Sequence, residues 1–357
     1  MIEALGSVAT ISVATSTGAA EAPEGIHFVE LSRPSGSRLR AHSRPEPRLG
    51  LDVIDASGRR ILAEAVRSLR PQAVLFAHSY LAAAAGPMEG PLRVVDFANL
   101  ETRRLSSFAR AGRLRNRVPA AIEAAKAARW EPAVARDADV AIAVDELDAQ
   151  QLADWGARVV VVPNAHHRPA TAPVPSPPNG PVTYLASMSY PPNRIAGAEL
   201  IRSIWPLVRS RVPDARLVIA GKDAGTHFAW ADGLDGVELH SDPEDAEIIL
   251  AAASLVVVPV RQGGGTQLKV TEALGLGRLP VVTGYSARSI PTAVRSLCPV
   301  AESNAAMAAA ICQLVESVDE RHRRERLVLD AGLPDWGAAC RPLLEVVASR
   351  TNVFEAA

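Results

Sequence analysis

The feature that most constrains the fold is a regular alternation between short apolar runs and longer segments rich in Ala, Leu and Arg. Most of the short runs are continuously apolar and rich in β-branched residues, which is typical of parallel strands buried on both faces. The intervening segments are long enough for helices, so the alternation predicts repeated strand–helix–strand units and an α/β fold. The predicted strands are Val8–Ala14, Ile26–Leu31, Ala73–Ala77, Leu92–Asp96, Val140–Val144, Val159–Val162, Val182–Ala186, Arg216–Ala220, Val237–His240, Leu255–Val258 and Leu279–Thr283.

A proline-rich segment divides the chain into two halves. Residues 168–181 (RPATAPVPSPPNGP) contain six prolines in fourteen positions, which excludes a helix and a central strand. We therefore expect an extended linker there, between an N-terminal domain over 1–167 and a C-terminal domain over 182–335. The remaining residues, 336–357, are predicted to form a helix that crosses back to the first domain. Two domains also suit the length of 357 residues.

Composition and charge exclude several classes of protein. With 48% hydrophobic and 22% charged residues the chain is not disordered as a whole, and a net charge of −1 gives it no general affinity for nucleic acid. Cys298, Cys312 and Cys340 lie far apart, so they indicate neither a disulfide framework nor a zinc site. No signal peptide is visible, and no apolar run reaches the roughly 20 residues of a membrane span. We therefore expect a cytoplasmic protein.

The second half opens with a strand, a loop and a helix. The predicted strand 182–186 is followed by the loop SMSYPPN and then by a helix over 196–212 whose apolar residues form one stripe. Asn193 stands where it can cap this helix. Pro206 lies inside the helix and is expected to kink it.

Residues 254–283 carry the most chemical information, because a buried strand there runs into a glycine-rich loop and then a helix. Glycine allows a ligand to approach the backbone closely, and the start of a helix offers unpaired N–H groups to a diphosphate. Lys269 adds a positive charge in the first turn, and Glu272 on the same helix face can accept hydrogen bonds from sugar hydroxyls. The predicted ligand-binding residues of this segment are Gly263, Gly264, Gly265, Thr266, Gln267, Lys269 and Glu272.

The pattern has a plainer interpretation, in which GGG is an ordinary turn and Lys269 and Glu272 form a solvated surface pair. The segment contains neither a Walker A loop nor a GxGxxG fingerprint.

Three segments resemble, in the same order, parts of the family-4 retaining glycosyltransferases, also called glycosyl transferases group 1. Residues 272–282 (EALGLGRLPVV) resemble the end of the family's donor motif, and residues 184–221 resemble the first βαβ unit of its nucleotide-binding domain. Residues 159–167 (VVVVPNAHH) resemble its interdomain Pro-Asn-Gly turn, with Ala165 in place of Gly. The resemblance covers about residues 70 to 340 and implies the GT-B fold, in which two Rossmann-like domains face a cleft.

The resemblance also implies roles for single residues of the donor site. Glu272 occupies the second Glu of the family's Glu-x7-Glu motif, which is expected to hold the ribose hydroxyls of a UDP- or GDP-sugar. Gly264 occupies the first Glu position and so departs from the motif. Ser187 stands where many members carry a phosphate-binding Arg, and Lys222, just after Gly221, can substitute for it. Ser187, Asn193, Gly221 and Lys222 complete the predicted donor-binding residues.

In the N-terminal half, residues 73–86 resemble the strand whose final His faces the reaction centre, and His78 holds that position. Its expected role is a hydrogen bond to the donor sugar or to developing charge. Residues 94–101 resemble a second strand end, where Ala98 replaces the family's His and leaves Asn99 and Glu101 as acceptor-side candidates. The family's opening strand and Gly-rich loop have no counterpart at the start of this chain, so we expect the N-terminal domain to lack its first strand.

The function that the resemblance implies is retaining transfer of a hexose-type sugar from a nucleotide-diphosphate donor to a hydroxyl of a polysaccharide, lipid-linked or small-molecule acceptor. Neither a metal nor a cofactor is expected. Two alternatives stay open. One is a degenerate GT-B protein that binds a nucleotide sugar or a partner enzyme without catalysis. The other is a sugar-nucleotide epimerase of the same fold.

Three further segments carry clusters of arginine, aspartate or histidine. Segment Arg103–Arg117 holds six arginines in fifteen residues, which suits either peripheral contact with an anionic membrane or a solvated arginine-rich helix. Asp137 and Asp139 spell the DxD motif of another glycosyltransferase fold but lack its context, so metal binding is not expected. The adjacent His166 and His167 are expected to be solvated.

Overall fold

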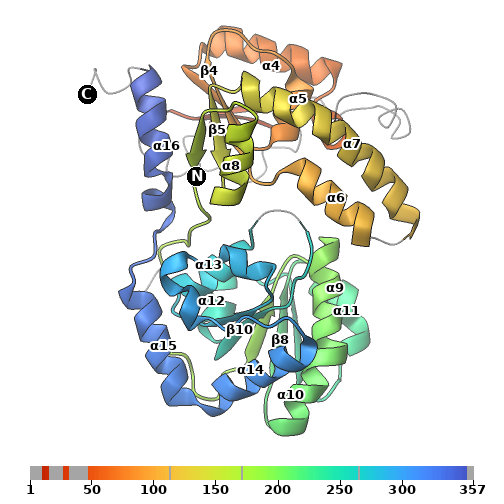
Figure 1. Cartoon of the computed structure of the whole chain (residues 1–357), viewed down its shortest axis with the longest axis vertical. Coiled ribbons are helices and arrows are strands. Elements are labelled where there is room, and N and C mark those ends of the chain that lie inside the picture. Colours follow the sequence, from red (N-terminus) through yellow and green to blue (C-terminus); the bar gives the residue numbers. More distant parts are fainter. Residues whose placement is uncertain are drawn as a thin grey trace. The chain divides into compact units, whose positions relative to one another are not determined.

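The computed structural model (Figure 1) describes residues 10–15, 27–31, 47–111, 114–169, 172–263 and 266–351. Its contacts divide the chain into two compact units. Unit 1 comprises Met1–Pro163 and Gly337–Ala357, and unit 2 comprises Asn164–Trp336. Each of the eleven predicted strands overlaps an observed strand, and all strand pairs in the sheets are parallel. The predicted α/β class is confirmed.

Unit 1 is built on a four-stranded sheet with the order β3-β4-β5-β6. The strands are β3 (Ala73–Phe76), β4 (Leu92–Phe97), β5 (Val140–Ala143) and β6 (Val159–Val161). Every residue of β5 is buried, as expected for a central parallel strand covered on both faces. The helices of this unit are α3 (Arg48–Leu51), α4 (Ala56–Leu69), α5 (Ser79–Ala85), α6 (Glu101–Ala111), α7 (Leu114–Asp137), α8 (Glu146–Asp154) and, from Gly337 on, α16 (Trp336–Thr351).

Two short strands precede this sheet in the sequence. β1 (Ser12–Thr15) and β2 (His27–Glu30) pair in parallel with each other and form a separate two-stranded sheet.

Unit 2 is built on a five-stranded sheet with the order β11-β10-β7-β8-β9. Its strands are β7 (Val182–Leu185), β8 (Leu217–Gly221), β9 (Val237–Ser241), β10 (Leu255–Val258) and β11 (Pro280–Val282). From β7 the chain adds β8 and β9 on one side, and then returns to add β10 and β11 on the other side. This reversal makes β7 and β10 a topological switch point, where open α/β sheets bind ligands at the carboxyl ends of the strands.

Helices and short helical turns connect these strands and continue the chain after β11 (Figure 1). They are α9 (Pro191–Glu199), η1 (Leu200–Ile204), α10 (Trp205–Arg211), α11 (Ala224–Phe228), η2 (Ala229–Ala231), α12 (Ala246–Ala251), α13 (Leu268–Gly275), η3 (Ser286–Ser289), η4 (Thr292–Leu297), α14 (Asn304–Glu316) and α15 (Val318–Asp330).

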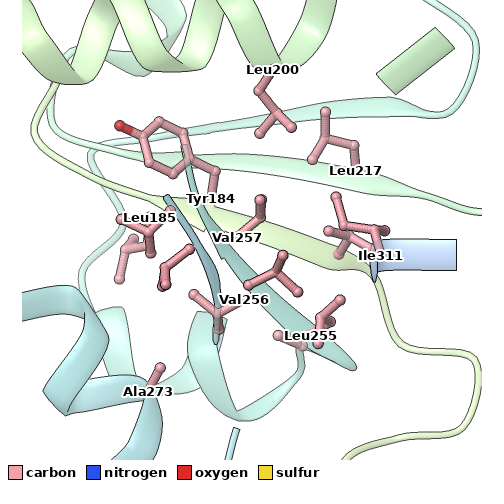
Figure 2. Packing of buried hydrophobic residues seen from close by; sticks show 14 of the residues in the cluster. Tyr184, Leu185, Leu200, Leu217, Leu255, Val256, Val257, Ala273 and Ile311 are labelled. Atoms are coloured by element: carbon pink, nitrogen blue, oxygen red, sulfur yellow. The ribbon is translucent and has the colours of Figure 1, made fainter. Parts of the chain in front are cut away.

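The core of unit 2 forms on both faces of its sheet, because side chains of a strand alternate between faces. Figure 2 shows Val257 of β10 on the same side as Leu200, and Val256 on the side of Ala273 in α13. All four residues are at most 1% exposed. Each buried aliphatic side chain of this size contributes about 1.5–3 kcal/mol relative to an exposed one, so this sheet is a rigid support for the loops at its ends.

The helix predicted over 196–212 begins earlier and is interrupted. It starts at Pro191, because prolines at the first two helical positions have a suitable φ and need no acceptor for an N–H. Asn193 therefore lies inside the first turn, and the prediction that it caps the helix is wrong. Just before Pro206 the helix contains the π-helical turn η1, in which the N–H of Trp205 bonds the carbonyl of Leu200. The kink expected at Pro206 stays a prediction.

The proline-rich segment has neither helix nor strand over 172–181 and lies on unit 2. The buried guanidinium of Arg321 donates to Ser176 Oγ at 2.9 Å and to the Pro177 carbonyl at 3.2 Å. Arg278, also buried, donates to the Val174 carbonyl at 2.8 Å. These bonds hold the segment against the unit, so the part described does not act as a free tether.

Candidate functional site

The candidate site lies in unit 2, where β7 and β10 end at the switch point. Four residues from three elements meet there, and we call them the switch-point cluster: Tyr184, Ser187, Asn193 and Lys269. Tyr184 comes from β7, Ser187 and Asn193 follow that strand, and Lys269 comes from the first turn of α13. The sequence prediction had placed Ser187, Asn193 and Lys269 in one site, and the structure brings these three together.

Lys269 is the cation of the cluster. Its Nζ donates to Oδ1 of Asn193 at 2.9 Å and lies 5.3 Å from the centre of the Tyr184 ring, within cation–π range. Burial lowers the pKa of Lys269 to about 7, and the nearby Glu272 opposes that shift. Because Nζ donates one described hydrogen bond, its other N–H donors are available to a ligand at the switch point.

Asn193 is the centre of the cluster and is only 7% exposed. Its Nδ2 donates to the Ser187 carbonyl at 2.9 Å, and its own backbone carbonyl accepts from the Tyr184 hydroxyl at 3.1 Å. Sequence reasoning missed Tyr184, although a tyrosine inside an apolar strand signals a buried hydroxyl that needs a partner. Asn193 was predicted at the site, but its function as the residue that connects β7 and α13 was not.

Glu272 lies three residues after Lys269 on α13 and is half-buried. Burial raises its pKa, while His167 and Lys269 act in the opposite direction. Within the described residues its carboxylate has no hydrogen-bond or ion-pair partner, so both oxygens are available to a ligand.

At two positions of the predicted site, a side chain larger than that of glycine would lie very close to neighbouring atoms. Gly221 at the end of β8 has φ +124°, and an added Cβ would lie 2.1 Å from the Ala186 carbonyl oxygen. Gly263 has φ +144°, and an added Cβ would lie 3.0 Å from the Tyr190 hydroxyl. Both positions therefore favour glycine for conformational as well as steric reasons. Gly264 and Gly265 lie outside the described residues.

Thr266 and Gln267 are bonded within the protein. The Thr266 hydroxyl accepts from Asn164, and the backbone N–H of Gln267 donates to the Ser289 hydroxyl. The next two N–H groups, those of Leu268 and Lys269, begin α13, where a helix has no internal acceptor for them. The start of α13 thus offers backbone donors beside the Lys269 ammonium.

The side chain of Lys222 has no described hydrogen bond to the residues of the switch-point cluster. Its side chain is exposed, and its positive charge acts on Asp242, whose pKa is lowered mainly by a hydrogen bond from Ser241. Its backbone carbonyl accepts from the N–H of Met188 and so joins the loop after β7 to the end of β8. The structure places Lys222 at the β8 and β9 ends.

In unit 1, His78 and Glu101 lie near each other at the ends of β3 and β4. The His78 ring stacks on Tyr80 at a centroid distance of 4.8 Å. Burial lowers the pKa of His78, with Glu101 raising it and Arg104 lowering it to smaller extents. A neutral imidazole near pH 7 can donate and accept hydrogen bonds but carries no charge. Asn99 is half-buried and follows β4.

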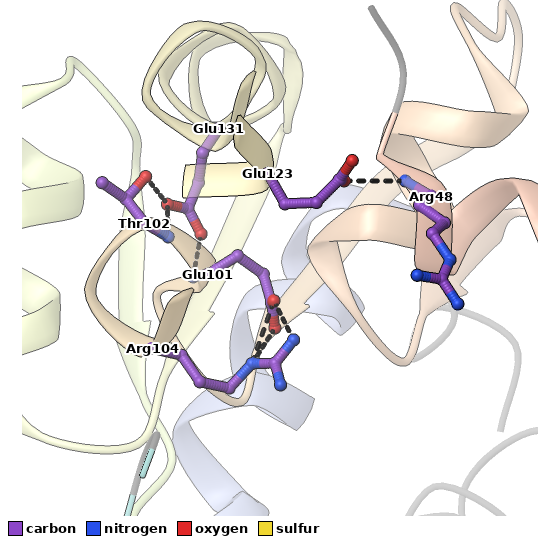
Figure 3. A network of polar contacts seen from close by, with 6 residues as sticks. All are labelled: Arg48, Glu101, Thr102, Arg104, Glu123 and Glu131. Atoms are coloured by element: carbon purple, nitrogen blue, oxygen red, sulfur yellow. Dashed lines mark hydrogen bonds and ion pairs between the residues drawn. The ribbon is translucent and has the colours of Figure 1, made fainter. Parts of the chain in front are cut away.

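The Glu101 carboxylate is already bonded to Arg104, which donates to both of its oxygens (Figure 3). Beneath it, Glu131 of α7 accepts from the backbone N–H groups of Glu101 and Thr102 and from the Thr102 hydroxyl at 2.7 Å. Glu131 is fully buried, and burial raises its pKa to about 7. This network caps the start of α6 and occupies Glu101, so Glu101 is a weaker acceptor-side candidate than Asn99.

The arginine-rich segment is partly occupied within unit 1. Arg103 pairs with the buried Asp148, and Arg104 pairs with Glu101. Arg110 and Arg117 are exposed, whereas the side chains of residues 111–116 lie outside the described residues.

Across the described ranges no group of three His, Cys, Asp or Glu side chains is arranged to hold a metal. Asp139 accepts instead from the backbone N–H of Arg93 at 2.8 Å. His167 is exposed as expected, but His166 is half-buried and faces α13, where a Cβ added to Gly275 would lie 2.3 Å from its ring. The expectation that both histidines are solvated is therefore wrong for His166.

A cavity of about 560 Å³ in unit 2 lies elsewhere, beside the early residues of β7, β8 and β9. Its walls include Pro177, Val218 and His240. The cavity is lined by none of the switch-point cluster residues. Among the residues that the structure describes, no helix is long and apolar enough to cross a membrane.

Comparison with known proteins agrees with this geometry. Residues 181–317 match the family model described as glycosyl transferases group 1. Solved structures with a similar fold include WaaG, a glycosyltransferase involved in lipopolysaccharide biosynthesis, at 12% identity and a TM-score of 0.65, covering 97% of this chain and 93% of WaaG. Sucrose-phosphate synthase from Thermosynechococcus elongatus gives 13% identity and a TM-score of 0.67, covering 99% of this chain and 92% of that one.

TarM from S. aureus, solved with fondaparinux, alpha-GlcNAc-glycerol and UDP, gives 13% identity and a TM-score of 0.62, covering 85% of this chain and 60% of TarM. No curated protein matches the chain. At these identities the solved structures show the fold, while the family match covers most of unit 2. The predicted resemblance is confirmed: the chain has the GT-B fold of two Rossmann-like domains, and residues 181–317 in its unit 2 match the glycosyl transferases group 1 model.

Proposed function

We propose that this protein is a retaining glycosyltransferase that moves a hexose-type sugar from a UDP- or GDP-linked donor to a hydroxyl acceptor. The observation that carries the proposal is the position of Lys269. It lies at the switch point of a domain that matches the group 1 family, and its ammonium has a single neutral hydrogen-bond partner among the described residues. A cation in that state suits an incoming diphosphate.

The chemistry requires stabilisation of the negative charge that develops on the departing diphosphate. Lys269 and the first N–H groups of α13 would supply it, since a helix start and an ammonium both favour an anion. Glu272, with both carboxylate oxygens available, would accept hydrogen bonds from the ribose. Gly263, Gly264, Gly265 and Thr266 would form the loop around the diphosphate, with Ser187, Gly221 and Lys222 at the neighbouring strand ends.

His78 would contribute from unit 1 a hydrogen bond to the donor sugar, in its neutral form. Asn99 would contact the acceptor, because Glu101 is occupied by Arg104. In this proposal the leaving phosphate helps to deprotonate the acceptor hydroxyl on the face that the donor leaves, and no side chain acts as a nucleophile. The configuration at the transferred carbon is thereby retained.

Fold relatives guide the choice of probes. TarM was solved with UDP and a GlcNAc-glycerol, and WaaG is involved in lipopolysaccharide biosynthesis. These names support UDP-sugars as first donors and glycans or lipid-linked glycans as first acceptors to be tried.

The test is a thermal-shift panel of UDP, GDP and their sugars, followed by measurement of nucleoside diphosphate release. We expect a shift with at least one nucleotide, release that increases with an acceptor, and no loss of rate when EDTA is added. Binding without release would support the non-catalytic alternative. An isomerised donor without a glycoside product would support the epimerase alternative. A chain that is folded but unaffected by every nucleotide would contradict the proposal.

We further propose a cytoplasmic protein with peripheral contact to the inner face of the membrane through the segment Arg103–Arg117. Exposed Arg110 and Arg117 support this, together with Val118 at 66% and Ile122 at 44% exposure on the following helix turns. Exposed basic and apolar side chains close together in the sequence are typical of segments that bind anionic lipid. Sedimentation with phosphatidylglycerol vesicles should carry the protein down, and phosphatidylcholine vesicles should not. Equal sedimentation with both, or none with either, would contradict membrane contact.

A further inference from the structure

The Lys269 ammonium is held by a neutral amide and not by a carboxylate. Its Nζ donates to Oδ1 of Asn193 at 2.9 Å, and no other described residue accepts a hydrogen bond from it. Glu272, three residues further along α13, influences its charge but forms no ion pair with it within the described structure. Lys269 is half-buried, and a lysine that is partly removed from water is usually matched by a carboxylate, because an unpaired charge with little hydration is unfavourable.

The Asn193 side chain has one orientation that satisfies its neighbours. Its Nδ2 donates to the Ser187 carbonyl at 2.9 Å, which leaves Oδ1 toward Lys269. The reversed amide would place its NH2 group against the ammonium and its oxygen against a carbonyl oxygen. The Tyr184 hydroxyl, bonded to the Asn193 carbonyl at 3.1 Å, fixes the backbone from the other side. The amide is thus a rigid support for Nζ.

The elements packed against Nζ differ in the charge that they carry. α13 provides Glu272, which favours the ammonium, and β7 provides the uncharged Tyr184, whose pKa is raised by burial. α9 provides only the neutral Asn193 at hydrogen-bond distance. His167 acts on Glu272 and not on Lys269 directly. The charged form of Nζ therefore lacks a full counter-charge in the ligand-free protein, which favours the neutral amine, and an arriving anion would supply that counter-charge.

We propose that Asn193 is a positioning residue that holds Lys269 toward the donor diphosphate without neutralising it, so that nucleoside diphosphate binding takes up a proton at Nζ. This inference rests on the proposed function of unit 2 as a donor domain. In the proton uptake, the amine lone pair of Nζ receives one proton from the buffer, and no bond of the nucleotide forms or breaks.

The experiment is calorimetry of UDP and GDP binding to the full chain at pH 8, in two buffers with different ionisation enthalpies. The terminal phosphate, with a pKa of about 6, is already deprotonated at this pH and contributes no uptake. We expect the wild type to take up close to one proton per nucleotide bound. Lys269→Met should take up almost none. Lys126→Met removes an ammonium of unit 1 that is paired with Glu123, and it should behave as the wild type.

Two substitutions of Asn193 separate its charge from its shape. Asn193→Ala and Asn193→Asp both remove the donor to the Ser187 carbonyl, but only Asp places a carboxylate beside Nζ. Asn193→Asp should lose proton uptake, because Lys269 is already charged in the free protein, and should bind more weakly than Asn193→Ala. Asn193→Ala should keep the uptake while binding several-fold more weakly than the wild type.

The outcomes distinguish this inference from the function on which it rests. Nucleotide binding without proton uptake, or equal uptake in wild type and Lys269→Met, overturns the inference and leaves the proposed function intact. Absence of binding by both nucleotides overturns the proposed function and the inference together. If the Asn193 variants do not fold, as judged by circular dichroism, the comparison of wild type with Lys269→Met still decides the result.

Discussion

Glu131 in unit 1 is fully buried and Lys269 in unit 2 is half-buried, and the two ionisable groups differ in how far the protein fills their hydrogen-bonding capacity. The Glu131 carboxylate accepts two backbone N–H bonds and one hydroxyl bond from the start of α6. The Lys269 ammonium donates one bond, to a neutral oxygen. A buried ionisable group whose hydrogen bonds are all made within the protein stabilises the fold. A group with donors that the protein leaves unbonded can instead form hydrogen bonds to a ligand, and these strengthen ligand binding.

The same contrast explains which conspicuous charges are not sites. Arg103 and Arg104 belong to a segment with six arginines in fifteen residues, yet each is paired with an acid of its own unit. Lys269 is one of only three lysines and has no such partner within the described residues. In this protein a high number of charged residues in one segment is therefore a poorer indication of a binding site than a charged group with unbonded donors.

The largest expected effect is a loss of stability when the hydrogen bonds of Glu131 in unit 1 are removed. Glu131→Ala removes the acceptor of three buried donors and should lower the free energy of unfolding by about 3 kcal/mol. Urea denaturation measures the loss. Nucleotide affinity in unit 2 should be unchanged, and a parallel loss of affinity would contradict the division between structural and ligand-binding charge.

The next largest effect is a loss of nucleotide affinity when the Lys269 ammonium in unit 2 is removed. Lys269→Met should weaken UDP or GDP binding about 10- to 100-fold near neutral pH, because charged hydrogen bonds contribute about 1.5–3 kcal/mol. Calorimetry measures the affinity. An affinity within error of the wild type would remove Lys269 from the donor site, whatever its effect on stability.

A smaller effect concerns pH and the ligand-free protein. The folded pKa of Lys269, about 7, lies below the unfolded value of about 10.4, so the unfolded chain binds more protons between these values. Stability of the wild type relative to Lys269→Met should therefore rise with pH, by at most roughly 1 kcal/mol per unit from pH 7 to pH 9. Denaturation at both values measures it, and a constant difference would show that the ammonium is well hydrated.

The smallest effect sharpens the comparison between lysines. Lys222→Ala removes an exposed ammonium at the β8 end and should change nucleotide affinity by less than about twofold, since exposed charges are screened. A loss as large as that of Lys269→Met would return Lys222 to the substitute role that the family resemblance implied for it.

Much of the fold could be predicted from local pattern alone. The strand runs, such as 182–185 and 255–258, were recognisable because parallel strands buried on both faces need continuous apolar residues. The position of Lys269 followed from the strand–glycine–helix order. The start of α9 was misplaced, because the prolines of SYPPN looked like a loop although they form the first turn of a helix.

The partners in the site could not be predicted, because they come from residues far apart in the sequence. Asn193 and Lys269 are separated by 76 positions, and Glu101 and Glu131 by 30. No local pattern states which amide faces which ammonium, or that a carboxylate of α7 caps α6. Such pairings depend on strand order and helix packing, which are properties of the whole unit.

By itself the sequence determined the α/β class, the strands, the glycine-rich loop before a helix and the presence of a lysine there, since each depends on neighbours within a few residues. Only the tertiary structure decided that Lys269 donates to a neutral amide, whereas Arg103, Arg104 and Glu131 form hydrogen bonds or ion pairs with other residues of unit 1. The physical reason is that the protonation and availability of a charged group depend on its burial and on the groups that surround it in space.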